Sequence, residues 1–290
     1  MNIFDYTVIF KELMDLFQIL KEHRHFGKQI LVLAKNELIK KYKGAVIGPL
    51  WAVVKPLFTL FVYWFAFDVG IKPLKNEHII INGADVGTFN RFIFMLVGFI
   101  PWFFINDSIT QGAKSIRENR QFVTKVSFPV STIMTYTSVA RLYVHLFLSL
   151  LMYLYLTFRG FHPSIYNLQF FIYCPLMFLF FLALMWSTAP MSAFSRDFEN
   201  MIISIMSGIF WLSGIVYNSY NTEFSKIIHY FMLLNPINFF ANGYRNTFIY
   251  HRWFWEYPNE LYVFLIEFAF VIGFGIFNYN RLRKTLPDVL

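Results

Sequence analysis

The sequence predicts an all-α membrane protein with six transmembrane helices, and its composition, its apolar stretches and the placement of its basic residues support this class. Hydrophobic residues make up 57% of the chain and charged residues only 14%, whereas soluble proteins are about one-quarter charged. Six stretches are long enough to cross about 30 Å of hydrocarbon at about 1.5 Å per residue. They are Pro49–Val69, Phe89–Ile109, Val130–Phe158, Leu168–Phe194, Met201–Tyr217 and Leu261–Tyr279.

Residues 1–48 are predicted to be a cytoplasmic region with an interfacial amphipathic helix. Apolar residues recur there at spacings of three and four, which is the pattern of a helix with one apolar face. Neither half of the region has enough apolar residues to cross a bilayer, so a helix in the headgroup layer fits better. Residues 49–280 form the predicted six-span domain, and residues 281–290 form a cytoplasmic tail.

The lysines and arginines predict the orientation of the chain. With the N-terminus inside, the cytoplasmic segments hold sixteen of the 25 basic residues and the exterior segments seven, with Lys55 and Arg141 inside spans. Basic residues concentrate on the cytoplasmic side of membrane proteins, so both termini are predicted to be cytoplasmic. The net charge of +8 is then explained by topology, and nucleic acid is not expected as a partner.

Two connecting segments differ from ordinary loops. Residues 113–125, on the cytoplasmic side, carry a short helical pattern that ends before Pro129. Residues 218–250, on the exterior side, are too apolar for a solvated loop. Two short re-entrant helices, broken at Asn235 and Pro236, would explain that composition, because irregular backbone at membrane depth must be sheltered by protein.

Motifs for several kinds of catalysis are absent from the sequence. There is no Gly-x-x-x-x-Gly-Lys-Ser/Thr phosphate loop, no His-Glu-x-x-His and no Gly-x-Ser-x-Gly. The lone cysteine, Cys174, lies in an apolar run and is interpreted as a packing residue. His23 and His25 stand beside lysines and are expected to be solvated. We therefore predict no catalytic residue and no metal site.

A few ionisable residues fall inside the predicted spans. Such residues are costly in a bilayer and usually face a polar pathway or a partner. Lys55 and Asp68 lie near the ends of the first span, where their side chains can also reach the interface. Arg141 is deeper. It shares a helix face with His145, and the two can hold a phosphate, or Arg141 can pair with Glu267; both interpretations stay open.

Five motifs in order resemble one family, the permease subunits of type-2 ABC exporters that move lipid-linked polysaccharides. These permeases approach their first span through a basic segment with Tyr, two Gly, Trp and Pro at set spacings, which Tyr42, Gly44, Gly48, Trp51 and Pro56 match. Alanine at 45, where serine is common, and Gly214, where many relatives have proline, depart from the pattern. The other motifs are Gly98–Phe104 with Asn119, Lys125–Pro129, Arg196–Phe198, and Leu234–Pro236 with Arg245.

The resemblance implies a mechanism and a set of partners. Two copies of this permease would enclose a channel in the bacterial cytoplasmic membrane, among membrane lipids. Two separate ATPase subunits would bind beneath them and carry the ATP and Mg, so this chain itself needs no cofactor. The cargo would be an undecaprenyl-diphosphate-linked glycopolymer. Trp102–Asp107 and Gly160–Tyr166 are most similar to the teichoic-acid translocation permeases of Gram-positive bacteria.

Three groups of site residues follow from the resemblance. ATPase coupling is assigned to the predicted helix at 113–125, with Lys114, Arg117, Glu118, Arg120 and Lys125. The cargo diphosphate is expected at the cytoplasmic entrance, near Lys40, Lys41, Lys43 and Arg196. Sugars stack on aromatic faces, and the channel candidates, which can equally be ordinary packing residues, are Trp51, Phe58, Tyr63, Trp102 and Phe103, with Arg141 and His145.

Other functions are compatible with part of the sequence. O-antigen and capsular polysaccharide permeases share the same sequence frame. A membrane transferase acting on a polyprenyl-linked substrate would need an acidic cluster near one membrane face, for which Asp197 and Glu199 are the candidates. A drug exporter of the same transporter class is the third alternative, and the long interfacial N-terminal region argues against it.

Overall fold

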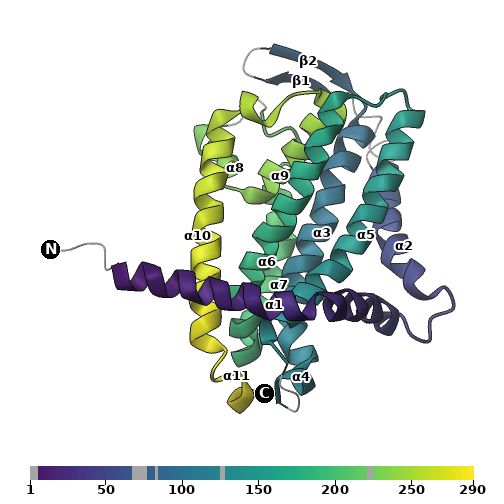
Figure 1. The fold of residues 1–290 in the computed structure, drawn as a ribbon. Helices are drawn as coiled ribbons and strands as arrows, with labels where there is room; N and C mark the ends of the chain where they lie inside the picture. The colour runs from purple at the N-terminus through teal and green to yellow at the C-terminus, as the bar shows by residue number, and fades with distance from the viewer. Residues whose placement is uncertain (1–5, 67–76, 82–83, 125–127, 221–224) are drawn as a thin grey trace.

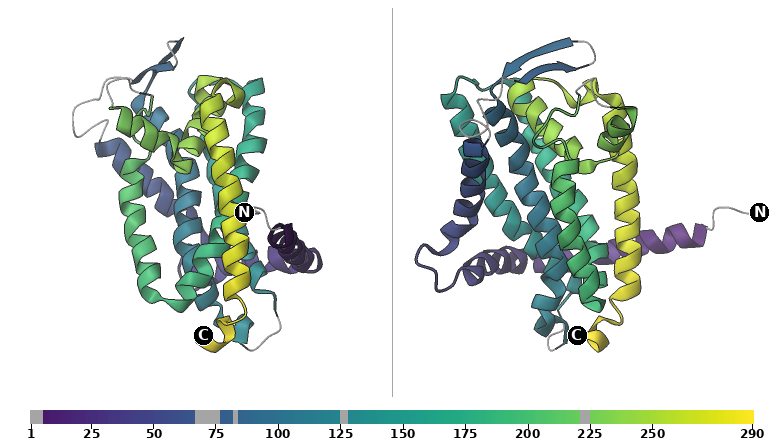
Figure 2. Two further views of the ribbon diagram at one scale, coloured as in Figure 1. Left: turned by 90° about the vertical axis from the view of Figure 1, so that its left-hand side faces the viewer. Right: turned by 180° about the vertical axis from the view of Figure 1, so that it is seen from behind.

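The long helices of the protein lie side by side and form a bundle, and one further helix crosses that bundle (Figures 1 and 2). The computed structural model describes residues 6–66, 77–81, 84–124, 128–220 and 225–290. In chain order the helices and strands are α1 (Tyr6–Lys41), α2 (Trp51–Trp64), β1 (Glu77–Ile81), β2 (Ala84–Phe89), α3 (Arg91–Glu118), α4 (Arg120–Thr124), α5 (Val130–Phe158), α6 (Phe170–Phe194), α7 (Arg196–Leu212), α8 (Lys226–Leu233), α9 (Pro236–Arg245), α10 (Pro258–Leu282) and α11 (Leu286–Val289).

Within the described residues, four helices are long and apolar enough to cross a membrane. They are α3, α5, α10 and the segment Ile165–Phe194, which contains α6. The helix α7 has 17 residues, and the described part of α2 has 14, so both are shorter than about 20 residues. Both nevertheless run along the bundle (Figure 2). The count of six spans therefore stays a prediction.

The helix α3 lies at the centre of the bundle. It packs against α5, α6, α7 and α9. Most residues of its apolar stretch are buried inside the protein. The side chain of Asn90 caps its first turn by accepting hydrogen bonds from the backbone N–H of Phe92 (2.9 Å) and Ile93 (3.4 Å). The other helices are thus held around one buried axis.

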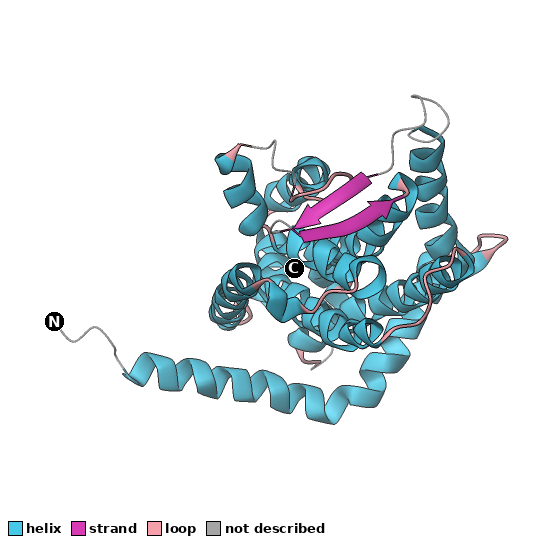
Figure 3. Ribbon diagram, turned by 90° about the horizontal axis from the view of Figure 1, so that it is seen from above, coloured by secondary structure: helices cyan, strands magenta, loops and turns pink. Residues whose placement is uncertain are grey.

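The N-terminal region forms the helix α1, which bends along its length (Figure 3). Its 36 residues extend about 54 Å at about 1.5 Å per residue, and they cross the bundle near the end that carries α4 and α11 (Figures 1 and 3). This is the direction expected for a helix lying in a membrane surface. Ile30 and Ala34 are buried in a cluster with Ile133 and Tyr136 of α5.

The expectation that His23 is solvated is wrong. Its ring nitrogens lie 2.6 Å from the hydroxyl of Thr135 on α5 and 2.7 Å from the carbonyl oxygen of Ile19, so this histidine joins α1 to the bundle. His25 is exposed, as expected.

The described part of the chain is mostly helical, which agrees with the all-α class, and it also contains one two-stranded hairpin that was not predicted. The strands β1 and β2 pair antiparallel, with a bulge between Ile79 and Ile80. This hairpin lies at the end of the bundle opposite α4 and α11 (Figure 1), and we call the two ends the hairpin end and the α1 end. The sequence signal was Asn82-Gly83 between two apolar runs, although these two residues lie outside the described part.

The apolar exterior segment contains two short helices, α8 and α9, at the hairpin end (Figure 1). The break between them falls at the predicted position. The side chain of Asn235 accepts a hydrogen bond from the N–H of Ile237 at 3.0 Å, and Pro236 occupies the first turn of α9. All residues of the range 237–250 are buried. Protein thus shelters residues 237–250, whereas α8 is largely exposed, with Ile227 at 80% and Tyr230 at 66%. Re-entry of the segment into a membrane stays a prediction.

The predicted helix at 113–125 is not a separate element. Residues 113–118 are the last turns of α3, which extends well beyond the predicted span end at Ile109, and α4 follows after Asn119. Lys125 of this predicted helix lies outside the described residues, as does Asp68 at the end of the first predicted span.

Candidate functional site

A polar cavity of about 400 Å³ lies where the C-terminal end of α1 meets α2, α3 and α5. Its basic side chains come from three helices: Lys41 from α1, Lys55 from α2 and Arg141 from α5. Asp107 of α3 is the acidic residue on its wall. Positions far apart in the chain thus place three cations and one carboxylate around a single space.

Arg141 is paired with an acidic residue of α1. Its Nη2 donates a hydrogen bond to Oε1 of Glu37 at 2.7 Å, and the hydroxyl of Thr137 donates to the other carboxylate oxygen at 3.0 Å. The alternative that Arg141 pairs with Glu267 is therefore wrong. Burial raises the pKa of Glu37, and the Arg141 charge and the Thr137 hydrogen bond partly oppose that rise.

The geometry leaves hydrogen-bonding capacity on Arg141. Its side chain is only 5% exposed, it lines the polar cavity, and its Nε has no hydrogen-bond partner among the described atoms. A buried guanidinium N–H without a partner is costly. An anion in this cavity would reduce that cost.

His145 does not offer a nitrogen to a ligand. One ring nitrogen lies 2.7 Å from the hydroxyl of Tyr244, and the other lies 3.3 Å from the carbonyl oxygen of Ile100. The side chain is 1% exposed. The interpretation that Arg141 and His145 jointly hold a phosphate is thus not supported for His145, which instead connects α5 to α3 and α9.

A second cavity, of about 470 Å³, lies beside the first, between α1 and the ends of α3 and α5. Lys41, Gln111 and Arg141 line both cavities, and Lys40 lines this one. Burial and then the Arg141 charge lower the pKa of Lys41. Lys43 is exposed after α1 and lines neither cavity.

Of the remaining residues predicted for the diphosphate entrance and the channel, some line the polar cavity and others do not. Arg196 is exposed at the start of α7 and lines neither cavity. Trp102 and Phe103 do line the polar cavity. Trp51 and Phe58 are exposed on α2. Tyr63 packs against Phe99 and Phe210, with ring centroids 4.8 Å and 5.8 Å apart.

Of the predicted coupling residues, Arg117 forms an internal ion pair. Its Nη1 donates to Glu199 at 2.5 Å, and its Nη2 donates to the carbonyl oxygen of Ser192. Arg117 therefore joins α3 to α6 and α7. Glu118 and Arg120 are exposed and Lys114 is half-buried, so they form the accessible part of this group.

Arg245 was not predicted as a buried structural residue, because the topology placed it in an exterior segment. It is fully buried, and its guanidinium lies 3.6 Å from the ring centroid of Phe94. It donates to the carbonyl oxygens of Gly214 (2.6 Å) and Ile215 (2.7 Å) beyond the end of α7. A Cβ at Gly98 would lie 2.6 Å from its Nη2, which explains why glycine stands there.

The described part of the chain combines a bundle of long apolar helices with a cation-lined cavity, and comparison with known sequences identifies its class. The chain belongs to the ABC-2 type transporter family, which it matches over residues 28–249. This is a family of membrane transport subunits, and the chain is a multi-pass member of it.

Three relatives share the name O-antigen export system permease protein RfbA. The protein from Myxococcus xanthus is 24% identical over 238 residues, which cover 82% of this chain and 86% of that protein. Two proteins from Klebsiella pneumoniae are 26% and 25% identical over 267 and 269 residues, in each case 90% of this chain and 94% of the relative. The chain is homologous to these permeases.

Proposed function

We propose that this chain is the permease subunit of an exporter that moves a polyprenyl-diphosphate-linked polysaccharide across the bacterial cytoplasmic membrane. The observation that carries the proposal is the cavity at the α1 end, where Lys41, Lys55 and Arg141 converge within a membrane helix bundle. A diphosphate needs such cations when it leaves the headgroup layer, because its charge is costly in a low-dielectric environment. The family membership supports the same function.

ATP hydrolysis is assigned to separate subunits. The sequence has no phosphate loop of its own, and the ATP and Mg would be bound in two ATPase subunits beneath a pair of these permeases. The exposed residues at the α1 end, Glu118 and Arg120, are the proposed ATPase contact. Movement of the ATPases would shift α3 and α4 together as rigid bodies.

The identity of the polymer rests on two different observations. Three relatives are named for O-antigen export, which favours an O-antigen or a similar polysaccharide. The segments Trp102–Asp107 and Gly160–Tyr166 are the basis for wall teichoic acid as the finer proposal. Both polymers are carried on the same kind of lipid diphosphate, so the cavity itself does not distinguish them.

Transport in inverted vesicles tests the proposal. The chain is co-produced with a partner ATPase, and vesicles receive lipid-linked O-antigen or lipid-linked teichoic acid. We expect ATP-dependent accumulation of one polymer inside the vesicles. A partner ATPase with its phosphate-loop lysine replaced by alanine is the matched control and should abolish accumulation. Chemical turnover of the lipid-linked substrate by the purified chain without any ATPase would instead favour the transferase alternative.

A further inference from the structure

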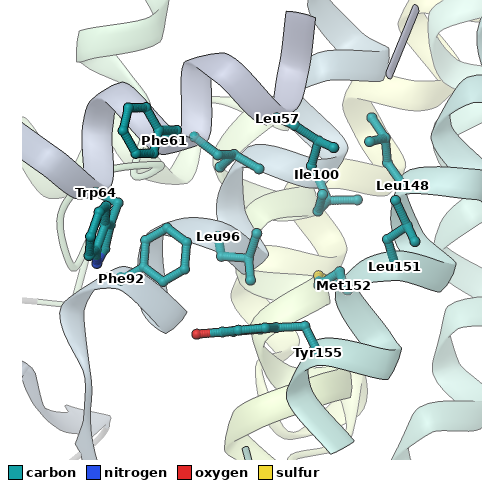
Figure 4. Close-up of a pocket in the computed structure, with 11 residues that line it drawn as sticks. Leu57, Phe61, Trp64, Phe92, Leu96, Ile100, Leu148, Leu151, Met152 and Tyr155 are labelled. Carbon is teal, nitrogen blue, oxygen red and sulfur yellow. The ribbon is translucent and has the colours of Figure 1, made fainter. Parts of the chain in front are cut away.

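An apolar cavity of about 460 Å³ lies between α2, α3 and α5, the same three helices that line most of the polar cavity (Figure 4). Its volume is in the range of small-molecule and cofactor sites. Figure 4 shows Leu57, Phe61 and Trp64 of α2 on one side, with Leu96 of α3 and Tyr155 of α5 opposite. Its walls are almost entirely hydrocarbon and aromatic.

The two cavities follow one another along the bundle. On α5 the polar cavity is lined by Arg141, the apolar cavity is lined by Tyr155, and Leu148 between them lines both. Fourteen residues of helix correspond to about 21 Å at about 1.5 Å per residue. The order on α3 agrees, because Leu96 and Ile100 line the apolar cavity and the residues from Trp102 onward line the polar one. On α2 the two sets of lining residues interleave. The three helices therefore enclose a path that begins among cations at the α1 end and continues into apolar surroundings.

The helix α2 packs loosely on the other two helices along this path. Among its described residues only Leu60 is buried, while Leu57 and Phe61 remain 44% and 53% exposed. A helix held so weakly leaves room for an apolar chain between itself and α3. Direct packing of α2 on α3 and α5 would otherwise be the favourable arrangement, since it buries apolar surface.

The protein neutralises the charges at the polar end only in part: Arg141 is paired with Glu37, whereas the exposed side chains of Lys41 and Lys55 are not. Within the described part of the chain, no carboxylate lies within ion-pair distance of Lys41 or Lys55. Arg141 is buried with its Nε unpartnered, although Glu37 binds its Nη2. The three cations outnumber the two carboxylates beside them, Asp107 and Glu37, so the polar end keeps a net positive charge that favours an anionic ligand.

We propose that α2, α3 and α5 bind a polyprenyl diphosphate lipid, with the diphosphate among Lys41, Lys55 and Arg141 and the isoprene units nearest to it in the apolar cavity. The single apolar path fits one hydrocarbon chain, and the adjacent cations fit a diphosphate. This inference rests on the proposed function for the identity of the lipid, and it deepens that function by placing the carrier within one subunit.

Binding of undecaprenyl diphosphate to the purified full-length chain in detergent tests the proposal, by native mass spectrometry or a fluorescence titration. We expect Lys55→Gln to weaken binding about tenfold, the scale of one charge-assisted hydrogen bond. Lys35→Gln, an exposed lysine of α1 away from both cavities, is the matched control and should leave binding unchanged.

A second pair of variants probes the apolar end without changing any charge. Leu151 lines the apolar cavity, and Leu151→Trp should fill it and weaken binding by a similar factor. Leu150 is 52% exposed and does not line the cavity, so Leu150→Trp should have no effect. Thermal unfolding of all four variants shows whether each one is folded. This control matters most for Leu151→Trp, because Leu151 is half-buried and the other three side chains are exposed.

Competing ligands show whether the site recognises the whole lipid diphosphate, its hydrocarbon chain alone, or any anionic lipid. Undecaprenol and phosphatidylglycerol should each bind at least tenfold more weakly than undecaprenyl diphosphate, and inorganic diphosphate should not displace it. Equal binding of phosphatidylglycerol, or binding unaffected by both Lys55→Gln and Leu151→Trp, would overturn the inference. These assays require no transport, so they fail independently of the vesicle experiment.

Discussion

At the scale of single residues, buried charges determine how α1 is attached to the bundle. Glu37 and Arg141 are 19% and 5% exposed and lie 2.7 Å apart, so each one stabilises the other in a setting where a lone charge is costly. The two residues differ in whether the one left behind can lose its charge after its partner is removed. A carboxylate can take up a proton, whereas a guanidinium stays charged at all accessible pH values.

The first prediction compares Glu37→Leu with Arg141→Met. Glu37→Leu leaves a buried guanidinium and should lower the free energy of unfolding by about 3 kcal/mol. Arg141→Met leaves Glu37, whose pKa burial already raises. Because the folded state then holds a proton more tightly than the unfolded state, the stability of this variant should fall as pH rises above the ordinary carboxyl range.

Thermal unfolding in detergent at pH 5 and pH 8 measures the difference. Arg141→Met should lose less stability at pH 5 than at pH 8 relative to the wild type, whereas the loss for Glu37→Leu should not become smaller at pH 5. The exposed Glu118→Leu serves as the control with little loss. Equal, pH-independent losses for both variants would show that the ion pair does not hold α1 in place.

At the scale of elements, sequence patterns predicted the apolar helices better than their ends and contacts. Arg91–Glu118 is one helix, and Arg117 near its end is paired with Glu199 across the bundle. No local pattern reveals such a long-range partner, so the polar end of α3 resembled a separate coupling helix. The hairpin carried a local turn signal in Asn82-Gly83, whereas the burial of Arg245 depends on the carbonyl groups of Gly214 and Ile215.

The second prediction separates the structural from the coupling role at the end of α3. Arg117→Glu should place two carboxylates together, lower the stability by about 2–3 kcal/mol, and be partly restored by the charge swap with Glu199→Arg. Arg120→Glu changes an exposed residue and should leave stability within about 0.5 kcal/mol. If α4 contacts the ATPase, Arg120→Glu should still reduce the stimulation of ATPase activity in the assembled complex.

Unfolding of the purified chain and ATPase assays of the complex give the two readouts. Lys28→Glu, an exposed residue on α1, is the control for a general change in surface charge. Wild-type stimulation with Arg120→Glu would remove α4 from the proposed interface. A failure of the charge swap to restore stability would mean that the Arg117–Glu199 pair is not the main contact.

At the scale of the whole molecule, the two ends of the bundle differ in kind. One end carries α1, α4 and α11, and the other carries the hairpin with α8 and α9 (Figure 1). The distribution of basic residues predicted two such sides. The lone cysteine, Cys174, is buried in α6, which makes the assignment of the two ends directly measurable.

The last prediction is that the hairpin end faces the exterior and the α1 end faces the cytoplasm. In a Cys174→Ala background, single cysteines replace Thr88 on β2, Lys226 on α8 and Lys28 on α1, all of them exposed positions. A membrane-impermeant maleimide applied to intact spheroplasts should label Thr88→Cys and Lys226→Cys but should label Lys28→Cys only after lysis. Positive-inside asymmetry is the physical reason, because basic residues next to the spans are retained on the cytoplasmic side. Labelling of Lys28→Cys in intact spheroplasts would reverse the orientation and place the cation-lined cavity on the wrong side for cargo uptake.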